Sequence, residues 1–537
     1  FNMPNLSESI KKLAEIVSKA STEAHVNGED DTINVDDVAA RVASFYEAIR
    51  GIVDWREEHL LRKTAIERIL KRRSLLQSEL SGENGTDAAE QFLRELVRGG
   101  HFPNRSIPLE KIEEIRQVLN KYAYILKNSG NGVKRKKEEL NEWFVQMASY
   151  EVEITLDPHE KELGLVDFTT KDLLERVKLR AEDKKLMTED EKNLQIYVAV
   201  HRVLFKMDDP VIAYHLLGRL YGDWHNPSEG TLQHVASHVW GVKELIEKTL
   251  EFPYGEKFYR LVERHDTPYL ILGDIIGDKS TSLKEIAEDE GKLDIETGKA
   301  YKVRLNKLKG KIRRAAIYST VSIFISKVFI ALLLEVPLDR YIQGNINTVA
   351  ITTSVLIPPV LMLLLVTSVK LTSDKNVANV KKEVKALVSA EDRIDYYIIF
   401  PKLRSTLSRF IFAIFYLLSF AISYGLVTWL LLSYGFGPFS VLIFLFFVSL
   451  IAFAGTKIQQ RGRELIVGEV RSSFIGGILD FLFLPVIQVG KWLSKQLVRY
   501  NAIVFIFNFL IETPIQVFLE FFEQWRNFLR DKKEEIH

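Results

Sequence analysis

The chain has 537 residues, of which 47% are hydrophobic and 27% are charged, and its formal net charge is +1. This balance indicates neither a nucleic-acid partner nor a polyacidic tail. The absence of cysteine excludes disulfides, thiolate zinc sites, cysteine nucleophiles and cysteine-ligated iron–sulfur clusters. The average conceals a split, because the chain is charged up to about Arg314 and rich in apolar runs after it. Phe1–Lys12 lacks a basic region followed by an apolar core, so we expect no signal peptide.

The first part of the chain, residues 1–127, is predicted to form a block of helices. Apolar residues at steps of three and four predict an amphipathic helix from Asp36 to about Leu80, and Ser81–Asp87 is predicted to break it. Two further helices and a flexible linker are expected after this break, over Ala88–Val97, Pro108–Leu126 and Asn128–Lys137.

A second helical block is predicted over residues 138–300. Thr188 and Glu191 fit a capping box that opens a helix to about Lys206. Asn226 is the predicted N-cap of a helix that runs to about Glu251, with proline at its first position. Ser282 with Glu285 repeats the capping-box pattern, and the two short strand-like pieces of this half are Glu151–Leu156 and Tyr269–Leu272.

Residues 301–471 are predicted to form a basic lead-in and four transmembrane helices. Each apolar run suits a hydrocarbon core of about 30 Å, and the runs are Ala315–Leu334, Val349–Val369, Phe410–Leu432 and Phe439–Ala454. Lysine and arginine crowd the segments before the first span, between the second and third, and after the fourth, whereas the two outer loops contain one basic residue, Arg340. Basic loops stay in the cytoplasm. The pattern therefore predicts a protein of the cytoplasmic membrane with its N-terminal domain and C-terminus in the cytoplasm.

The last segment, residues 472–537, is harder to interpret. Phe474–Gly490 is apolar but contains Asp480 and Pro485, and the second apolar piece, Ala502–Ile511, is short. If both pieces crossed, the basic loop between them would face outward, against the usual charge distribution. We expect re-entrant or in-plane amphipathic segments here, with six full spans as the alternative.

Histidines are densest at His215, His225, His234 and His238. His234 and His238 lie four apart on a predicted helix, so both rings could bind one metal ion, with His225 as a further ligand. The residues between them lack the glutamate of the H-E-x-x-H motif. We expect the histidines to be structural, with no bound metal or cofactor, and a metal site at His225, His234 and His238 is the alternative.

The segment Gly273–Ser280 has the order strand, glycine loop and helix that a phosphate-binding loop requires. Its spacing does not fit, because Asp278 stands between the glycine and the lysine. A capped turn is predicted instead.

Lys327 is the most informative single residue of the membrane half. It lies about 20 Å of helix beyond Arg314 at ~1.5 Å per residue, too deep to reach the cytoplasmic surface easily. Glu335 is about two turns further on, and Pro358 and Pro359 are predicted to break the second span and free carbonyls there. Such a charge lies either in a transport path or in a structural ion pair.

The fold class predicted from the sequence is all-α: a cytoplasmic helical domain followed by a polytopic α-helical membrane domain. The large soluble half lacks an intact catalytic motif, which favours a membrane-anchored interaction or scaffold protein over an enzyme. A cytoplasmic protein, the lipid bilayer and a second copy of the chain are its expected partners. A transporter or channel with a polar path along Lys327 and Glu335 is the alternative, and a membrane metalloenzyme using His234 and His238 is the third hypothesis.

Overall fold

The computed structural model groups the chain into two compact units, the first of residues 1–290 with 386–400 and the second of residues 291–385 with 401–511. The residues that the structure describes are 8–23, 32–35, 58–76, 82–130, 134–180, 182–279, 286, 289–344, 347–369, 374–389, 394–400, 406–467, 474–499, 521 and 525.

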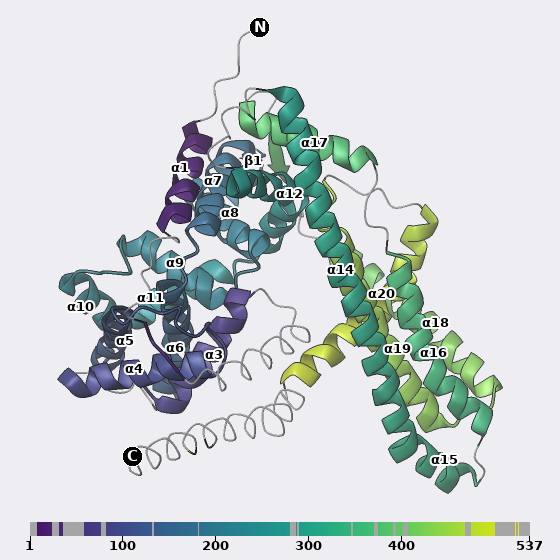
Figure 1. The fold of residues 1–537 in the computed structure, drawn as a ribbon. Coiled ribbons are helices and arrows are strands. Elements are labelled where there is room, and N and C mark those ends of the chain that lie inside the picture. The colour runs from purple at the N-terminus through teal and green to yellow at the C-terminus, as the bar shows by residue number, and fades with distance from the viewer. Residues whose placement is uncertain are drawn as a thin grey trace, which may run out of the picture. The chain divides into compact units, whose positions relative to one another are not determined.

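The first unit is a helical domain (Figure 1). Its described elements are α1 (Glu8–Glu23), α3 (Glu58–Arg73), α4 (Gly82–Arg98), α5 (Lys111–Asn128), α6 (Lys134–Leu156), α7 (Glu160–Arg176), β1 (Val177–Leu179), the short 3-10 helix Asp183–Lys185, α8 (Glu189–Leu204), α9 (Asp209–Tyr221), α10 (Glu229–Ser237), α11 (Val239–Leu250), α12 (Gly255–Lys279) and β2 (Tyr396–Ile398). One apolar core runs through α3–α6 and α8–α11, and α6 lies near its centre, with Phe144 and Val152 fully buried.

Local capping signals set several of these boundaries. The predicted capping box at Thr188 is confirmed, since its hydroxyl accepts from the Glu191 backbone and the Glu191 carboxylate accepts from the Thr188 backbone. The prediction of Asn226 as a cap is wrong. Ser228 caps the helix instead, and the predicted single helix is divided at His238 into α10 and α11.

The two predicted strand pieces are wrong, because Glu151–Leu156 lies in α6 and Tyr269–Leu272 lies in α12. The alternation at the first piece does not separate buried from exposed positions, since Glu151 and Glu153 are fully buried in ion pairs. The glycine segment that starts at Gly273 is likewise helical, so neither a phosphate loop nor a capped turn forms over 273–279.

Other predicted helix boundaries differ from those of the structure or fall on residues that the structure does not describe. The predicted break Ser81–Asp87 is shortened, because α4 already begins at Gly82, and the predicted linker after Asn128 gives way to α6 at Lys134. Most of the predicted helix from Asp36 lies outside the described residues, with α3 as its described part. The capping pattern at Ser282 also lies outside them.

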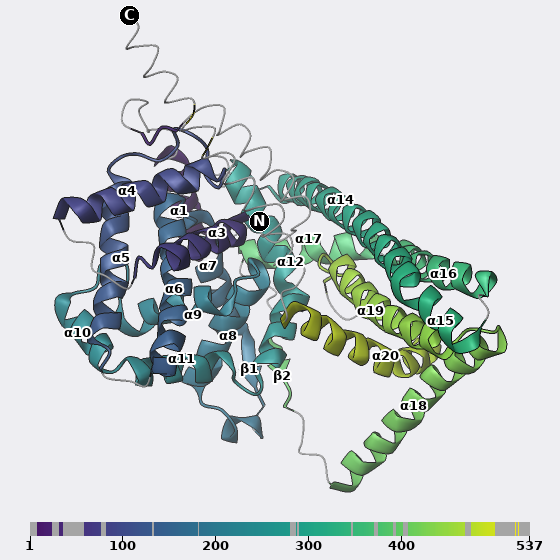
Figure 2. The same ribbon diagram turned by 90° about the horizontal axis from the view of Figure 1, so that it is seen from below.

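A parallel pair of short strands joins distant parts of the first unit. β1 follows α7 directly, and β2 comes from the segment between the second and third membrane helices, with Val177 opposite Tyr396. Arg176 donates a hydrogen bond to the Tyr396 hydroxyl and lies over the Tyr396 ring, and the His265 ring stacks on the same ring at 4.0 Å. Residues 394–400 are therefore an integral part of the helical domain (Figure 2).

The second unit contains the apolar helices. Its elements are α14 (Glu290–Ile330, whose first residue belongs to the other unit), the π-helical turn Ala331–Glu335, α15 (Val336–Gln343), α16 (Thr348–Thr367), α17 (Asp374–Ser389, which runs into the first unit), α18 (Thr406–Ser433), α19 (Pro438–Gly462) and α20 (Phe474–Arg499). Among the described residues, four helices have the length and composition to cross a membrane: Glu290–Tyr341, α16, α18 and α19. They contain three of the four predicted spans in full and all but the last two residues of the second, so the all-α fold with its membrane half is confirmed.

The helix α20 packs along α18 and α19. Pro485 lacks an N–H, so the Phe481 carbonyl has no helical partner, and the Ser419 hydroxyl in the middle of α18 donates to that carbonyl at 2.9 Å. Ser423, one turn on, donates to the Leu482 carbonyl at 2.5 Å. The choice among re-entrant, in-plane and spanning segments for residues 472–537 stays a prediction, and the side of Ser494 in a labelling experiment would decide it.

We expect reporter fusions at Asn128 and Lys385 to report the cytoplasm, and fusions at Gly344 and Phe436 to report the opposite side. The reason is twofold: the basic loops predict the orientation, and β2 pairs with β1 although two apolar helices separate them in sequence. A reporter at Asn128 on the outer side would contradict the orientation.

Candidate functional site

A pocket of about 440 Å³ lies in the helical domain, between α7, α8, α9 and the loop after α9. This volume is in the usual range of small-molecule sites. The lining is mostly aromatic and polar: Leu163, Val166 and Asp167 from α7, Tyr197 and His201 from α8, Tyr214, His215, Gly218 and Arg219 from α9, and Gly222, Asp223, Trp224 and His225 from the loop. We call it the histidine pocket.

Two stacked imidazoles form part of its wall. The rings of His201 and His215 lie 4.7 Å apart with an interplanar angle of 27°. Burial, and secondarily the neighbouring His215, holds the pKa of His201 well below its usual value. Burial lowers the pKa of His215 to about 4. Both rings are therefore neutral at pH 7.

The hydrogen bonds of these two rings leave one acceptor free. His201 Nδ1 lies 3.0 Å from the Met207 sulfur, which can only accept, so Nδ1 carries the proton and Nε2 offers a lone pair. His201 is 1% exposed, and its Nε2 has no hydrogen-bond partner among the described residues. His215 Nε2 is already paired with the Tyr150 hydroxyl at 2.9 Å. A buried polar atom without a partner is unusual in a native protein, and here it belongs to a pocket-lining side chain.

Acidification should destabilise the helical domain through His215. Its unfolded pKa is near 6.5 and its folded pKa is about 4, so the unfolded state binds more protons between these values. The contribution of neutral His215 to the free energy of unfolding is fully present above pH 6.5 and decreases as the pH falls. At pH 5 it has decreased by about 2 kcal/mol. Thermal unfolding of the full chain from pH 7.5 to 4.5 should be less pH-dependent in His215→Gln, which keeps a partner for Tyr150. An unchanged pH dependence would contradict this assignment.

A buried polar network fixes the outer rim of the pocket. Lys121 forms an ion pair with Glu151 and donates to the Trp224 carbonyl at 2.7 Å and the His225 carbonyl at 3.2 Å. Glu151 also accepts from the Tyr122 hydroxyl at 2.6 Å and lies 3.0 Å from His225 Nδ1. The backbone that carries Trp224 and His225 is thus held in place from α5 and α6.

The structure divides the histidine cluster seen in the sequence. His215 and His225 line the pocket, whereas His234 and His238 stack on each other, with rings 4.6 Å apart, on exposed positions at the end of α10. In the part of the chain that the structure describes, His225, His234 and His238 are not among the ligand groups that converge on one point. His201 lies on α8, half of whose residues are apolar, and its pairing with His215 has no sequence signal.

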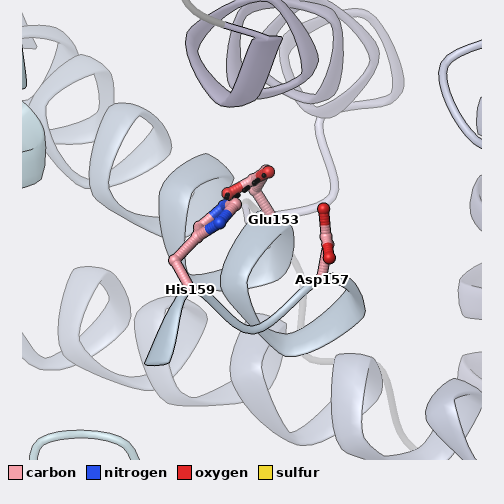
Figure 3. Close-up of side chains that lie close together, drawn as sticks. All are labelled: Glu153, Asp157 and His159. Atoms are coloured by element: carbon pink, nitrogen blue, oxygen red, sulfur yellow. Dashed lines mark hydrogen bonds and ion pairs between the residues drawn. The ribbon is translucent and has the colours of Figure 1, made fainter. Parts of the chain in front are cut away.

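One group of three potential metal ligands does converge among the described residues: Glu153, Asp157 and His159 (Figure 3). Arg62 already donates to Glu153 at 3.1 Å and forms an ion pair with Asp157. His159 Nε2 lies 2.9 Å from Glu153. Burial disfavours the charged imidazole, but the hydrogen bond to Glu153 and the negative charges of the nearby carboxylates together outweigh burial and raise the pKa of His159. The carboxylates are neutralised by protein cations, so the group is explained as an ion-pair cluster.

The second polar centre lies among the membrane helices. Lys327 of α14 forms an ion pair with Glu335, and both side chains are fully buried. The Ser354 hydroxyl of α16 donates to the second Glu335 oxygen at 3.0 Å, and the Lys327 ammonium lies 5.3 Å from the centre of the Phe447 ring of α19. Each charge therefore has protein partners in the interior of the bundle.

A π-helical turn at Ala331–Glu335 makes this ion pair possible. Eight residues of regular α-helix end about 80° beyond two full turns, which would place Glu335 off the face of Lys327. A π-helical turn takes more residues per turn, so it rotates Glu335 back toward the lysine. Pro337 follows directly and lacks the N–H that an α-helical bond to Leu333 would need.

The predicted break of the second span at its proline pair is wrong. α16 is continuous, and both Pro358 and Pro359 are buried within it. A proline is tolerated in a membrane helix when neighbouring helices hydrogen-bond to the carbonyls that it frees, or cover them. One turn beyond Glu335, Asp339 accepts a hydrogen bond from Ser440 of α19 at 2.7 Å.

Comparison with known proteins gives no relative to guide the assignment. No protein family, curated protein or solved structure compared with the chain matches it.

Proposed function

We propose that this chain is a membrane-anchored interaction protein whose helical domain binds a small ligand in the histidine pocket. The observation that carries the proposal is the cavity of about 440 Å³ in the helical domain, lined by the rings of Tyr197, Tyr214 and Trp224. A concave site of this volume, with aromatic walls and a few polar groups, is typical of small-molecule sites.

The anchoring part of the proposal is supported by the strand pair. Because β2 comes from between two membrane helices and is built into the helical domain, the domain is joined to the membrane helices at more than one point of the chain. This suits a domain held at the membrane surface, where it would meet a cytoplasmic protein partner.

A pocket-filling substitution tests the proposal. Gly218 lines the pocket on α9, and the nearest atom to a side chain built there is the Trp224 Cβ at 4.0 Å, so Gly218→Leu should fit while reducing the cavity. A Cβ added at Gly241 on α11 would meet no described atom outside its own helix within 4 Å, so Gly241→Leu is the matched control.

The full chain would be purified in mild detergent, and small molecules released from it would be identified by mass spectrometry. We expect one compound to be retained by the unchanged chain and by Gly241→Leu, and to be lost from Gly218→Leu. Equal recovery from all three proteins, or recovery from none, would contradict the proposal.

The second candidate function is a transporter or channel. Its supporting observation is the line of buried polar groups formed by Lys327, Glu335, Ser354, Asp339 and Ser440. Against it, each of these groups is paired with another, and a conducting path would have to open the pairs. Proton or ion flux into proteoliposomes that disappears in Lys327→Leu/Glu335→Leu would favour this second function.

A further inference from the structure

We propose that an anionic phospholipid binds along α14 at the point where this helix enters the membrane. Its phosphate is held by Arg313 and Arg314, and an acyl chain lies along the apolar residues that follow them. This site belongs to the second unit and is independent of the histidine pocket.

Basic residues crowd the part of α14 that precedes its apolar run. Seven lysines and arginines lie within residues 302–314, and no aspartate or glutamate stands between Glu296 and Glu335. Two acids nearer the start of the helix are already paired, Glu296 with Lys299 at 2.9 Å and Asp294 with Lys385 at 3.1 Å. An anion from outside α14 therefore meets a surface of strongly positive potential.

The two arginines are available to such an anion. Arg313 and Arg314 are exposed, and neither makes a hydrogen bond or an ion pair with a residue that the structure describes. The side of α14 that packs is a different one, marked by the buried Tyr301, Leu308 and Ile312. Side chains on a helix tilt toward its N-terminus, so both guanidinium groups extend away from the hydrocarbon. A guanidinium matches the geometry of a phosphate group.

The depth of each cation follows from the helical rise, because α14 is one continuous helix (Figure 1). The apolar run begins at Ala315, so Arg313 and Arg314 lie within about 3 Å of it along the helix. Lys307 and Lys302 lie about 12 and 20 Å from it. The headgroup layer on each side of a bilayer is about 5–8 Å thick. The arginines therefore lie among the lipid phosphates, and the two lysines lie beyond them.

The surface that continues from Arg314 into the membrane fits an acyl chain. Tyr318, Val321 and Ile325 follow it at steps of four, seven and eleven residues, which places all of them on its face of the helix. Their exposed fractions are 48%, 49% and 61%. A soluble anion would make no use of this apolar strip. A phospholipid fits both parts, since it joins a phosphate to hydrocarbon chains.

Lipid binding to the full chain in a neutral detergent tests the proposal. Native mass spectrometry would count bound dioleoylphosphatidylglycerol, which is anionic, and dioleoylphosphatidylcholine, which has the same acyl chains and no net charge. We expect the anionic lipid to bind more tightly and its advantage to shrink as the salt concentration rises. Inorganic phosphate in millimolar excess should not displace it, because phosphate alone lacks the contact with the apolar strip.

Two matched double substitutions on the same helix locate the site. Arg313→Gln/Arg314→Gln should weaken phosphatidylglycerol binding about 25-fold, because each cation at the membrane surface contributes about fivefold. Lys302→Gln/Lys307→Gln removes the same charge farther from the phosphates, where salt screens it, and should weaken binding about twofold or less. Phosphatidylcholine binding should be the same in both variants.

Equal binding of the two lipids to the unchanged chain, displacement by inorganic phosphate, or equal losses in the two double variants would overturn the inference. If the double arginine variant does not fold, Arg314→Gln alone decides. It should weaken phosphatidylglycerol binding about fivefold, and an unchanged affinity would contradict the site.

Discussion

Replacing Lys327 alone by leucine should destabilise the membrane helices by about 3 kcal/mol. The substitution leaves Glu335 buried without its counter-charge, and breaking one side of a buried ion pair typically reduces stability by about 3–5 kcal/mol. We expect the lower end of that range, because Glu335 keeps the hydrogen bond from Ser354. Thermal unfolding of the full chain in detergent measures the effect.

The double variant Lys327→Leu/Glu335→Leu is the decisive control for this prediction. Removing both charges replaces the pair by apolar side chains, which in other buried pairs is neutral or stabilising. The double variant should therefore regain most of the stability lost by the single one. A single variant as stable as the unchanged chain would mean that the pair does not hold the helices together.

Gly490→Ala should be the most disruptive small substitution in the second unit. A Cβ at position 490 would lie 1.9 Å from the Ser449 carbonyl oxygen and 2.9 Å from the Phe453 Cβ, and the first of these atoms belongs to the backbone of α19. Neither helix can yield without moving as a whole, so we expect a loss of more than about 2 kcal/mol, as for other overpacked contacts. The melting temperature in detergent and cross-linking between α19 and α20 would both fall.

Gly425→Ala on α18 provides the matched comparison, because no neighbouring atom of the described part of the chain lies within 4 Å of a Cβ there. Alanine is the better helix former, so this variant should be at least as stable as the unchanged chain. Equal behaviour of the two variants would show that α20 does not pack against α19 as described.

The sequence predicted the features of the fold that depend on local signals. Long apolar runs gave the four membrane helices, and the pairing of Thr188 with Glu191 gave a helix start. The wrong predictions came from short patterns that tertiary contacts override. The alternation at Glu151–Leu156 looked strand-like only because two glutamates are buried by partners more than 25 residues away, Lys121 and Arg62.

The candidate site was predictable only in part, for the same reason. The density of histidines drew attention to His215 and His225, which do line the pocket. His201 was missed, because its stacking partner His215 becomes a neighbour only when α8 and α9 pack together. Arg176 and Tyr396 are in contact although they are 220 positions apart in the sequence, so no local sequence pattern predicts their contact.

In the membrane half, the sequence indicated that Lys327 and Glu335 belong together but did not show how. Regular helical geometry leaves them on different faces. The π-helical turn that aligns them depends on Pro337 and on the surrounding helices, and such turns have no dependable sequence signature.

The most direct test of the proposed function is a density map of the full chain, prepared in lipid nanodiscs from native membranes without added ligand. The account predicts density for a small molecule in the histidine pocket, together with a closed contact between Lys327 and Glu335. An empty histidine pocket with a water-filled path beside a separated Lys327 and Glu335 would contradict it and favour transport.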